Sequence, residues 1–144
     1  MLFRSIKVQA DLYPELPMIL GNPGKLQQVF LNLFLNAKDA MPNGGTLTIA
    51  TGNGHAVNVR VSDTGSGIAQ EHIARIYDPF FTTKNSTKDG DRRGTGLGLS
   101  VTCGIIQEHP GKIQVESLPG EGTSFHLEFP MIKTPTRKAV NVNV

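Results

Sequence analysis

The sequence predicts an α+β fold, a two-layer α/β sandwich with about three helices on one face of a mixed, mostly antiparallel sheet. Two pairs of short alternating runs, at 46–62 and at 112–129, are each interrupted by a glycine-rich turn, as in β-hairpins. Two longer runs, 23–41 and 97–108, repeat their apolar residues at helical spacing. Strands therefore group beside helices, which favours one sheet with one helical layer.

The N-terminal third predicts strands and then a long helix. Residues 6–8 and 17–20 are short β-like runs. Asn22 before Pro23 is typical of an N-cap followed by the first helical position. Apolar residues then recur at helical spacing through 23–41, which predicts an amphipathic helix.

The remainder alternates hairpins with helices. The first hairpin joins 46–51 to 56–62, and a short helix is expected at 70–76. The loop at 78–94 is long and polar, as in lids that cover active sites. A third helix at 97–108 precedes a second hairpin that joins 112–118 to 123–129.

Length and composition predict one globular domain, residues 1–132, with a flexible basic tail at 133–144. Apolar residues make up 38% of the 144 and charged residues 18%, which is a globular composition. No apolar run approaches the roughly 20 residues of a membrane span, so no direct membrane contact is expected. The single Cys103 fits a reducing cytoplasm. A net charge of +2 gives no reason to expect nucleic acid as a partner.

Three polar residues share one face of the first helix. Asn32, Asn36 and Asp39 are spaced i, i+4 and i+7, which places them on one side. Polar groups within an apolar helix need partners, and an amide oxygen suits Mg²⁺. A solvated helix edge explains the same pattern equally well.

A carboxylate followed by glycines comes directly after a predicted strand, in Asp63-Thr64-Gly65-Ser66-Gly67-Ile68. A carboxylate there can accept a hydrogen bond from an exocyclic amine, and glycines let backbone approach a flat ring. Taken alone, the motif also fits an ordinary tight turn.

A second glycine motif, Gly94-Thr95-Gly96-Leu97-Gly98-Leu99-Ser100, opens the third predicted helix. Free backbone N–H groups and the helix dipole make such a start suitable for anions. It follows a polar loop rather than a βαβ start, and no Gly-Lys-Ser/Thr follows, so neither a Rossmann nor a Walker loop is indicated. Gly120-Glu121-Gly122-Thr123-Ser124-Phe125 reads by itself as a hairpin turn.

Together these segments, in this order, resemble the ATP-binding catalytic domain of sensor histidine kinases. The wider family includes type II topoisomerases, mismatch-repair ATPases and a heat-shock chaperone, and its fold is the Bergerat ATP-binding fold. Tyr77-Asp78-Pro79-Phe80-Phe81-Thr82-Thr83-Lys84 resembles the phenylalanine box before the ATP lid. The sequence around Asn32 and Asn36 most resembles that of kinases of the nitrogen-regulation type.

The resemblance implies ATP and Mg²⁺ as cofactors. It makes Asn36 the metal ligand, supported by Asn32, and Asp63 the residue that binds the adenine amine. Phe80 would be a wall or lid anchor, and Thr123 would complete the adenine pocket. The nucleotide-binding residues that it implies are Asn32, Asn36, Asp39, Asp63, Gly65, Gly67, Ile68, Phe80, Lys84, Arg93, Gly94, Thr95, Gly96, Leu97, Gly98, Leu99 and Thr123. For the cations Lys84, Arg92 and Arg93, a solvated charge cluster is the alternative.

In this family the nucleophile is a histidine on a separate dimerisation domain. None of the chain's four histidines is followed by a phosphoacceptor pattern, and His109 beside Pro110-Gly111 suits a helix C-terminus instead. The resemblance therefore implies a cytoplasmic kinase fragment, inactive in autophosphorylation alone. Its full-length kinase is free to be membrane-anchored. Its partners would be the dimerisation domain and a response regulator receiver domain.

Three alternatives stay open. One is an autonomous ATPase of the superfamily. The hydrolases of the superfamily resemble one another in having a glutamate, as general base for water, where this chain has Asn32, and this difference favours a kinase. Another is an anti-sigma serine kinase, disfavoured by the same position. The third is a degenerate module that uses the fold only to dock a partner, against which the intact glycine motifs argue.

Overall fold

The computed structural model describes residues 5–78 and 98–132, and the helices and strands below lie within them. A five-stranded sheet has the order β1-β2-β3-β5-β4. Its strands are β1 Ile6–Asp11, β2 Gly45–Asn53, β3 Val57–Asp63, β4 Lys112–Leu118 and β5 Gly122–Phe129. β1 runs parallel to β2, and the other neighbours are antiparallel. The predicted mixed sheet and both predicted hairpins are confirmed.

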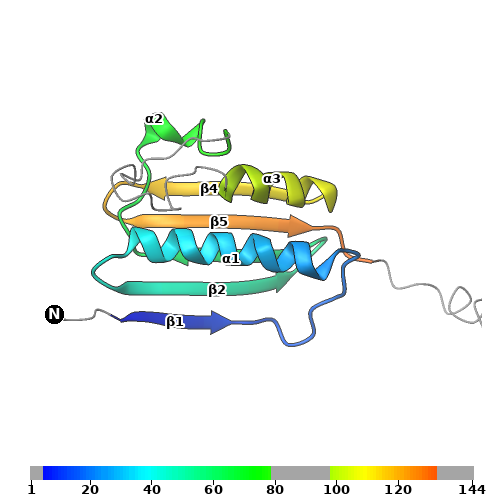
Figure 1. Cartoon of the computed structure of the whole chain (residues 1–144). Coiled ribbons are helices and arrows are strands. Elements are labelled where there is room, and N and C mark those ends of the chain that lie inside the picture. The colour runs from blue at the N-terminus through cyan, green and yellow to red at the C-terminus, as the bar shows by residue number, and fades with distance from the viewer. Residues whose placement is uncertain (1–4, 79–97, 133–144) are drawn as a thin grey trace, which may run out of the picture.

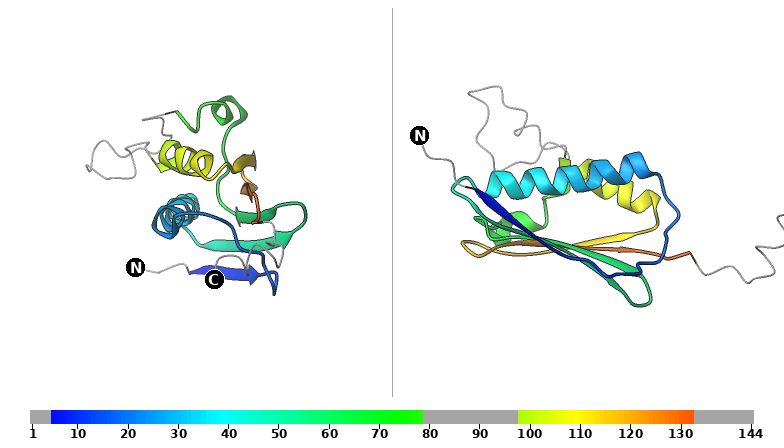
Figure 2. Two further views of the ribbon diagram at one scale, coloured as in Figure 1. Left: turned by 90° about the vertical axis from the view of Figure 1, so that its right-hand side faces the viewer. Right: turned by 90° about the horizontal axis from the view of Figure 1, so that it is seen from below.

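Two helices form the second layer (Figures 1 and 2). α1, Pro23–Ala40, and α3, Gly98–Glu108, lie side by side on one face of the sheet and run in opposite directions. The short α2, Gln70–Ile73, contacts β4. The predicted α+β sandwich is therefore confirmed. No helix among the described residues is long and apolar enough to cross a membrane.

The core lies between the two layers. Residues along β3 and β5 alternate between buried and more exposed, as expected when one face of a sheet is covered and the other is open. Each helix places an apolar stripe against this face. The core includes Val29, Leu33 and Ala37 of α1, Ile105 and Ile106 of α3, Val57, Val59 and Val61 of β3, and Phe125, Leu127 and Phe129 of β5.

Local signals fix the start of α1. The Asn22 side chain accepts a hydrogen bond from the Lys25 backbone N–H at 3.1 Å, and Pro23 occupies the first turn. An Asn N-cap satisfies one of the N–H groups that a helix start leaves unpaired. The predicted N-cap is confirmed, and the predicted end at residue 41 differs by one position.

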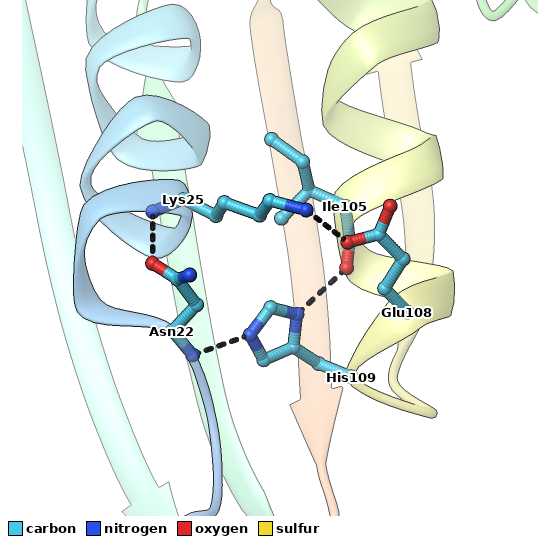
Figure 3. A network of polar contacts seen from close by, with 5 residues as sticks. All are labelled: Asn22, Lys25, Ile105, Glu108 and His109. Carbon is cyan, nitrogen blue, oxygen red and sulfur yellow. Dashed lines mark hydrogen bonds and ion pairs between the residues drawn. The ribbon is translucent and has the colours of Figure 1, made fainter.

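His109 joins the far ends of the two helices (Figure 3). Its Nδ1 lies 2.8 Å from the Ile105 carbonyl oxygen, and its Nε2 accepts from the Asn22 N–H at 2.9 Å. Only the tautomer with the proton on Nδ1 satisfies both contacts. The predicted structural role of His109 at a helix end is confirmed.

Two sequence predictions need correction, and three others concern residues outside the described part of the chain. Residues 17–20 form no strand, and only Ile19 makes an isolated bridge, to Met131. Pro17 has no backbone N–H to donate, which limits pairing there. The helix predicted at 70–76 ends at Ile73. The predicted lid from 79 onward, the start of the third helix at Leu97 and the tail at 133–144 lie outside the described residues.

Candidate functional site

Three of the chain segments that the sequence singled out lie at one end of the sandwich. The C-terminus of α1, the end of β3 and the β4–β5 turn are at the left end of Figure 1, while α3 begins nearer the middle, where Asn32 of α1 contacts Gly98. The strand register places the end of β3 beside the start of β5. Residues from opposite halves of the chain therefore share one site.

The polar face of α1 contacts the first turn of α3. The Asn32 side-chain Nδ2 donates to the Gly98 carbonyl oxygen and to the Thr102 hydroxyl, both at 3.2 Å. Asn36 and Asp39 follow on the same helical face, one and two turns nearer to the C-terminus of α1. The metal-ligand candidate Asn36 therefore lies one turn beyond the Asn32–Gly98 contact, toward the C-terminus of α1.

Asp63 is the last residue of β3, and its carboxylate is held by backbone. Its Oδ1 accepts a hydrogen bond from the Gly65 N–H at 2.8 Å. Burial raises the pKa of the Asp63 carboxyl above its ordinary value, while hydrogen bonds from the Gly65 and Thr123 backbones oppose this shift. A half-buried carboxylate with a fixed orientation suits recognition of one donor group.

A row of three side chains crosses the sheet at this level. Asp63 on β3 pairs directly with Thr123 on β5, which pairs directly with Ser117 on β4. Directly paired residues lie on the same face of a sheet. The Ser117 and Thr123 hydroxyl oxygens are 2.7 Å apart, and Thr123 is buried.

Ser117 also belongs to this row, although no sequence motif indicates it. Its hydroxyl accepts from the Ile68 N–H at 2.7 Å and donates to the Gly122 carbonyl at 3.0 Å. The Gln70 amide adds a bond to the Ser117 carbonyl at 2.9 Å. The loop after Asp63 is thus attached to the β4–β5 hairpin. A serine inside a strand carries no sequence signal of this role, because the contact depends on long-range register.

Two glycines allow the close approach of these segments. Gly67 has φ +77°, and a Cβ there would overlap the Leu118 carbonyl. Gly122 has φ +116°, and its Cβ would overlap the Asp63 carbonyl. Gly65 packs on Ala40, whose carbonyl accepts from the Ser66 N–H at 3.1 Å. Only glycine combines such φ values with such contacts.

The structure describes ten of the predicted nucleotide-binding residues, on α1, at the end of β3 and in the loop after it, at the start of α3 and on β5. Two of the apolar ones, Ile68 and Leu99, are partly buried against the core. The ten are Asn32, Asn36, Asp39, Asp63, Gly65, Gly67, Ile68, Gly98, Leu99 and Thr123. The others lie outside the described residues, namely Phe80, Lys84, Arg93, Gly94, Thr95, Gly96 and Leu97.

A separate hollow lies away from Asp63. It measures about 650 Å³ and is lined by Leu20, Lys25, Glu108, His109 and Ile132 among others, at the opposite end of the helices. Its polar members already pair with each other, Lys25 with Glu108 at 2.9 Å. Its volume alone does not make it a site, whereas oriented polar groups gather around Asp63, Thr123 and Ser117.

A family model described as "Histidine kinase-, DNA gyrase B-, and HSP90-like ATPase" matches residues 21–133. The chain belongs to this family. Sporulation kinase A of Bacillus subtilis strain 168 is 47% identical over 113 residues, which cover 78% of this chain and 18% of the relative. Sporulation kinase E of the same strain is 40% identical over 129 residues, covering 88% and 16%. Sensor histidine kinase ZraS of Escherichia coli O157:H7 is 40% identical, covering 89% and 27%.

Solved structures agree with these relatives. The catalytic domain of histidine kinase ThkA superposes with a TM-score of 0.73 at 33% identity, covering 88% of this chain and 79% of that one. Full-length ShkA, solved in complex with AMPPNP, gives 0.75 at 28% identity and covers 90% and 26%. The chain therefore corresponds to the catalytic ATP-binding domain of histidine kinases. It spans between 16% and 27% of the length of these three curated relatives.

Proposed function

We propose that this chain binds Mg-ATP at the end of the sandwich where Asp63 lies. In this proposal it transfers the γ-phosphoryl group to a histidine of a dimerisation domain outside the chain. A response regulator receiver domain would then take the phosphoryl group. The observation that carries the proposal is the Asp63 carboxylate, held by the Gly65 N–H beside Thr123 at the end of β3. Phosphoryl transfer asks the protein mainly for positioning and charge stabilisation, which suits a site of amides, glycines and one metal.

In this proposal, different residues bind the adenine, the metal ion and the phosphates. Asp63 accepts from the adenine amino group, with Thr123 beside it and Ile68 as an apolar wall. Asn36 supplies an amide oxygen to Mg²⁺, and Asp39 lies one turn further along the same face. The glycine segment that ends at Gly98 offers backbone N–H groups to the phosphates at the start of α3. Phe80, Lys84, Arg93, Gly94, Thr95, Gly96 and Leu97 complete the site in this proposal.

Location of the activity follows from the same proposal. ATP is the cytoplasmic phosphoryl donor, so this domain would act on the cytoplasmic side, whether or not its full-length kinase is anchored in a membrane. Nucleic acid is not part of the proposal, since the net charge is only +2. The boundary of the domain is proposed at residue 132, with 133–144 as a linker.

Calorimetry with ATP, with GTP and with EDTA tests the proposal. We expect Mg-dependent ATP binding, and loss of roughly 10- to 150-fold in affinity on Asn36→Ala, because a charge-assisted contact is removed. GTP should bind at least about tenfold more weakly, since guanine presents a carbonyl oxygen to the Asp63 carboxylate. Asp63→Ala should weaken ATP binding and narrow this difference. Equal ATP affinity of wild type, Asn36→Ala and Asp63→Ala would refute the proposed location of the ATP site.

Activity of the isolated chain supplies a second readout. With radiolabelled ATP, we expect no acid-labile phosphohistidine on the chain itself. Adding the dimerisation domain of the same kinase should produce labelling of that domain. Robust hydrolysis by the isolated chain would instead favour an autonomous ATPase.

A further inference from the structure

Asn32 joins α1 to the first turn of α3 through its side-chain amide. Gly98, which accepts one bond at 3.2 Å, is the first residue of α3, and Thr102, which accepts the other at 3.2 Å, is one turn further on. The Thr102 side chain is fully buried. A carbonyl oxygen can only accept, so the Gly98 contact fixes which end of the amide faces α3. Both amide hydrogens are then directed at α3.

This contact joins the two helices near the proposed site, and other contacts join them elsewhere. At the opposite end, Lys25 pairs with Glu108 at 2.9 Å, and His109 accepts from Asn22. Those contacts hold the helices together away from the nucleotide. Asn32 holds them one turn from Asn36, where α3 begins at Gly98.

We propose that Asn32 is a positioning residue, which fixes the first turn of α3 against the metal-binding face of α1. This inference rests on the proposed function, because it assumes that Asn36 holds Mg²⁺ and that the segment ending at Gly98 holds phosphates. The residues that would hold a metal and those that would hold phosphates must keep their relative positions to within a fraction of an ångström. A side chain that ties the two halves together directly is a suitable device for this.

The chemistry at this position requires an amide. A carboxylate has no hydrogen to donate, and it would place an oxygen against the Gly98 carbonyl oxygen. The Thr102 hydroxyl can rotate to donate to a carboxylate, but the carbonyl cannot. A carboxylate at this position would therefore lose the hydrogen bond to the Gly98 carbonyl and keep at most the contact with Thr102.

Three variants test the inference, namely Asn32→Asp, Thr102→Val and Thr102→Ser. Binding of Mg-ATP and of adenosine is measured for each by calorimetry or by competition. We expect Asn32→Asp to weaken Mg-ATP about tenfold and Thr102→Val about threefold to tenfold, each through loss of hydrogen bonds to α3. Thr102→Ser keeps the acceptor and should bind as wild type does. Adenosine should bind all variants equally, because Asp63 and Thr123 lie on the sheet.

The opposite results are distinct. If Asn32 were itself a metal ligand, Asn32→Asp would bind Mg-ATP as well as wild type or better, and Thr102→Val would have no effect. That outcome overturns the positioning role. Equal losses for adenosine and Mg-ATP would also overturn it, since they would indicate general damage. Failure of wild type to bind Mg-ATP would overturn the proposed function as well. If Asn36→Ala weakens Mg-ATP binding while the Asn32 and Thr102 variants match wild type, only this inference fails.

Discussion

Replacing His109 by phenylalanine should destabilise the domain without weakening its nucleotide site. His109 is 7% exposed and makes two hydrogen bonds, to the Asn22 N–H and to the Ile105 carbonyl. Phenylalanine fills a similar volume but makes neither bond. The Asn22 N–H, which precedes the first turn of α1, and an α3 carbonyl near its C-terminus would both lose their partner (Figure 3).

The magnitude follows from the burial of these groups. Leaving a buried polar group unpaired costs about 1–3 kcal/mol, so two partly buried groups give a loss of about 2–4 kcal/mol. Lys25→Gln is the matched control in the same corner. It breaks the exposed Lys25–Glu108 pair, with side chains 50% and 56% exposed, and should cost less than about 1 kcal/mol.

Urea unfolding at equilibrium measures both free energies, and ATP calorimetry measures the site. We expect His109→Phe to lower the urea midpoint by much more than Lys25→Gln does, with an unchanged dependence of the unfolding free energy on urea concentration. ATP affinity should be close to that of wild type in both variants. A Lys25→Gln loss equal to the His109→Phe loss would refute the reasoning, because it would make the exposed ion pair the main contact.

Two further variants concern the site end. Burial raises the pKa of Asp63 above its ordinary value of 3.8, so ionisation of this carboxyl opposes folding. The penalty grows as pH rises from 3.8 to the raised pKa of the folded state, and it is constant above that pKa. Asp63→Asn should therefore be more stable than wild type at pH 7, with a difference that shrinks as pH approaches 3.8; urea midpoints at several pH values check this, and a constant difference would contradict it. Burial also raises the pKa of Tyr77 to about 12, and its buried hydroxyl has no hydrogen-bond partner in the described structure. Tyr77→Phe should stabilise the domain by about 1 kcal/mol in thermal unfolding, and a loss of stability would show that the hydroxyl has a partner.

Elements with strong local signals were predictable from the sequence. The long helix was expected at 23–41 and is found at Pro23–Ala40, because its N-cap, proline and apolar spacing are all local features. The second hairpin was expected at 112–118 and 123–129 and is found at Lys112–Leu118 and Gly122–Phe129 for the same reason. The strand expected at 17–20 is absent apart from the Ile19–Met131 bridge, because Pro17 has no N–H to donate to a ladder.

Site contacts set by tertiary structure were harder to predict. Resemblance located Asp63 and Thr123, and the antiparallel register then makes them direct neighbours. Ser117 escaped prediction because its role depends on the Ile68 N–H, 49 residues away. The Asn32 contact with Gly98 spans 66 residues and likewise needs the packed helices. Residue types indicate what chemistry is present, whereas register and packing decide which groups meet.

The two ends of the sandwich differ in how well their polar groups and backbone are satisfied. At the Lys25 end, charges pair, and His109 uses both ring nitrogens. At the Asp63 end, a carboxylate is partly desolvated, and Gly67 and Gly122 hold positive φ angles. A partly desolvated carboxylate lowers stability and persists where function requires it. If ATP binds at the Asp63 end, it offsets this cost by mass action, since only the folded domain offers the site. The well-satisfied end then keeps α1 and α3 together when no nucleotide is bound, so that Asn32 has to position only the first turn of α3.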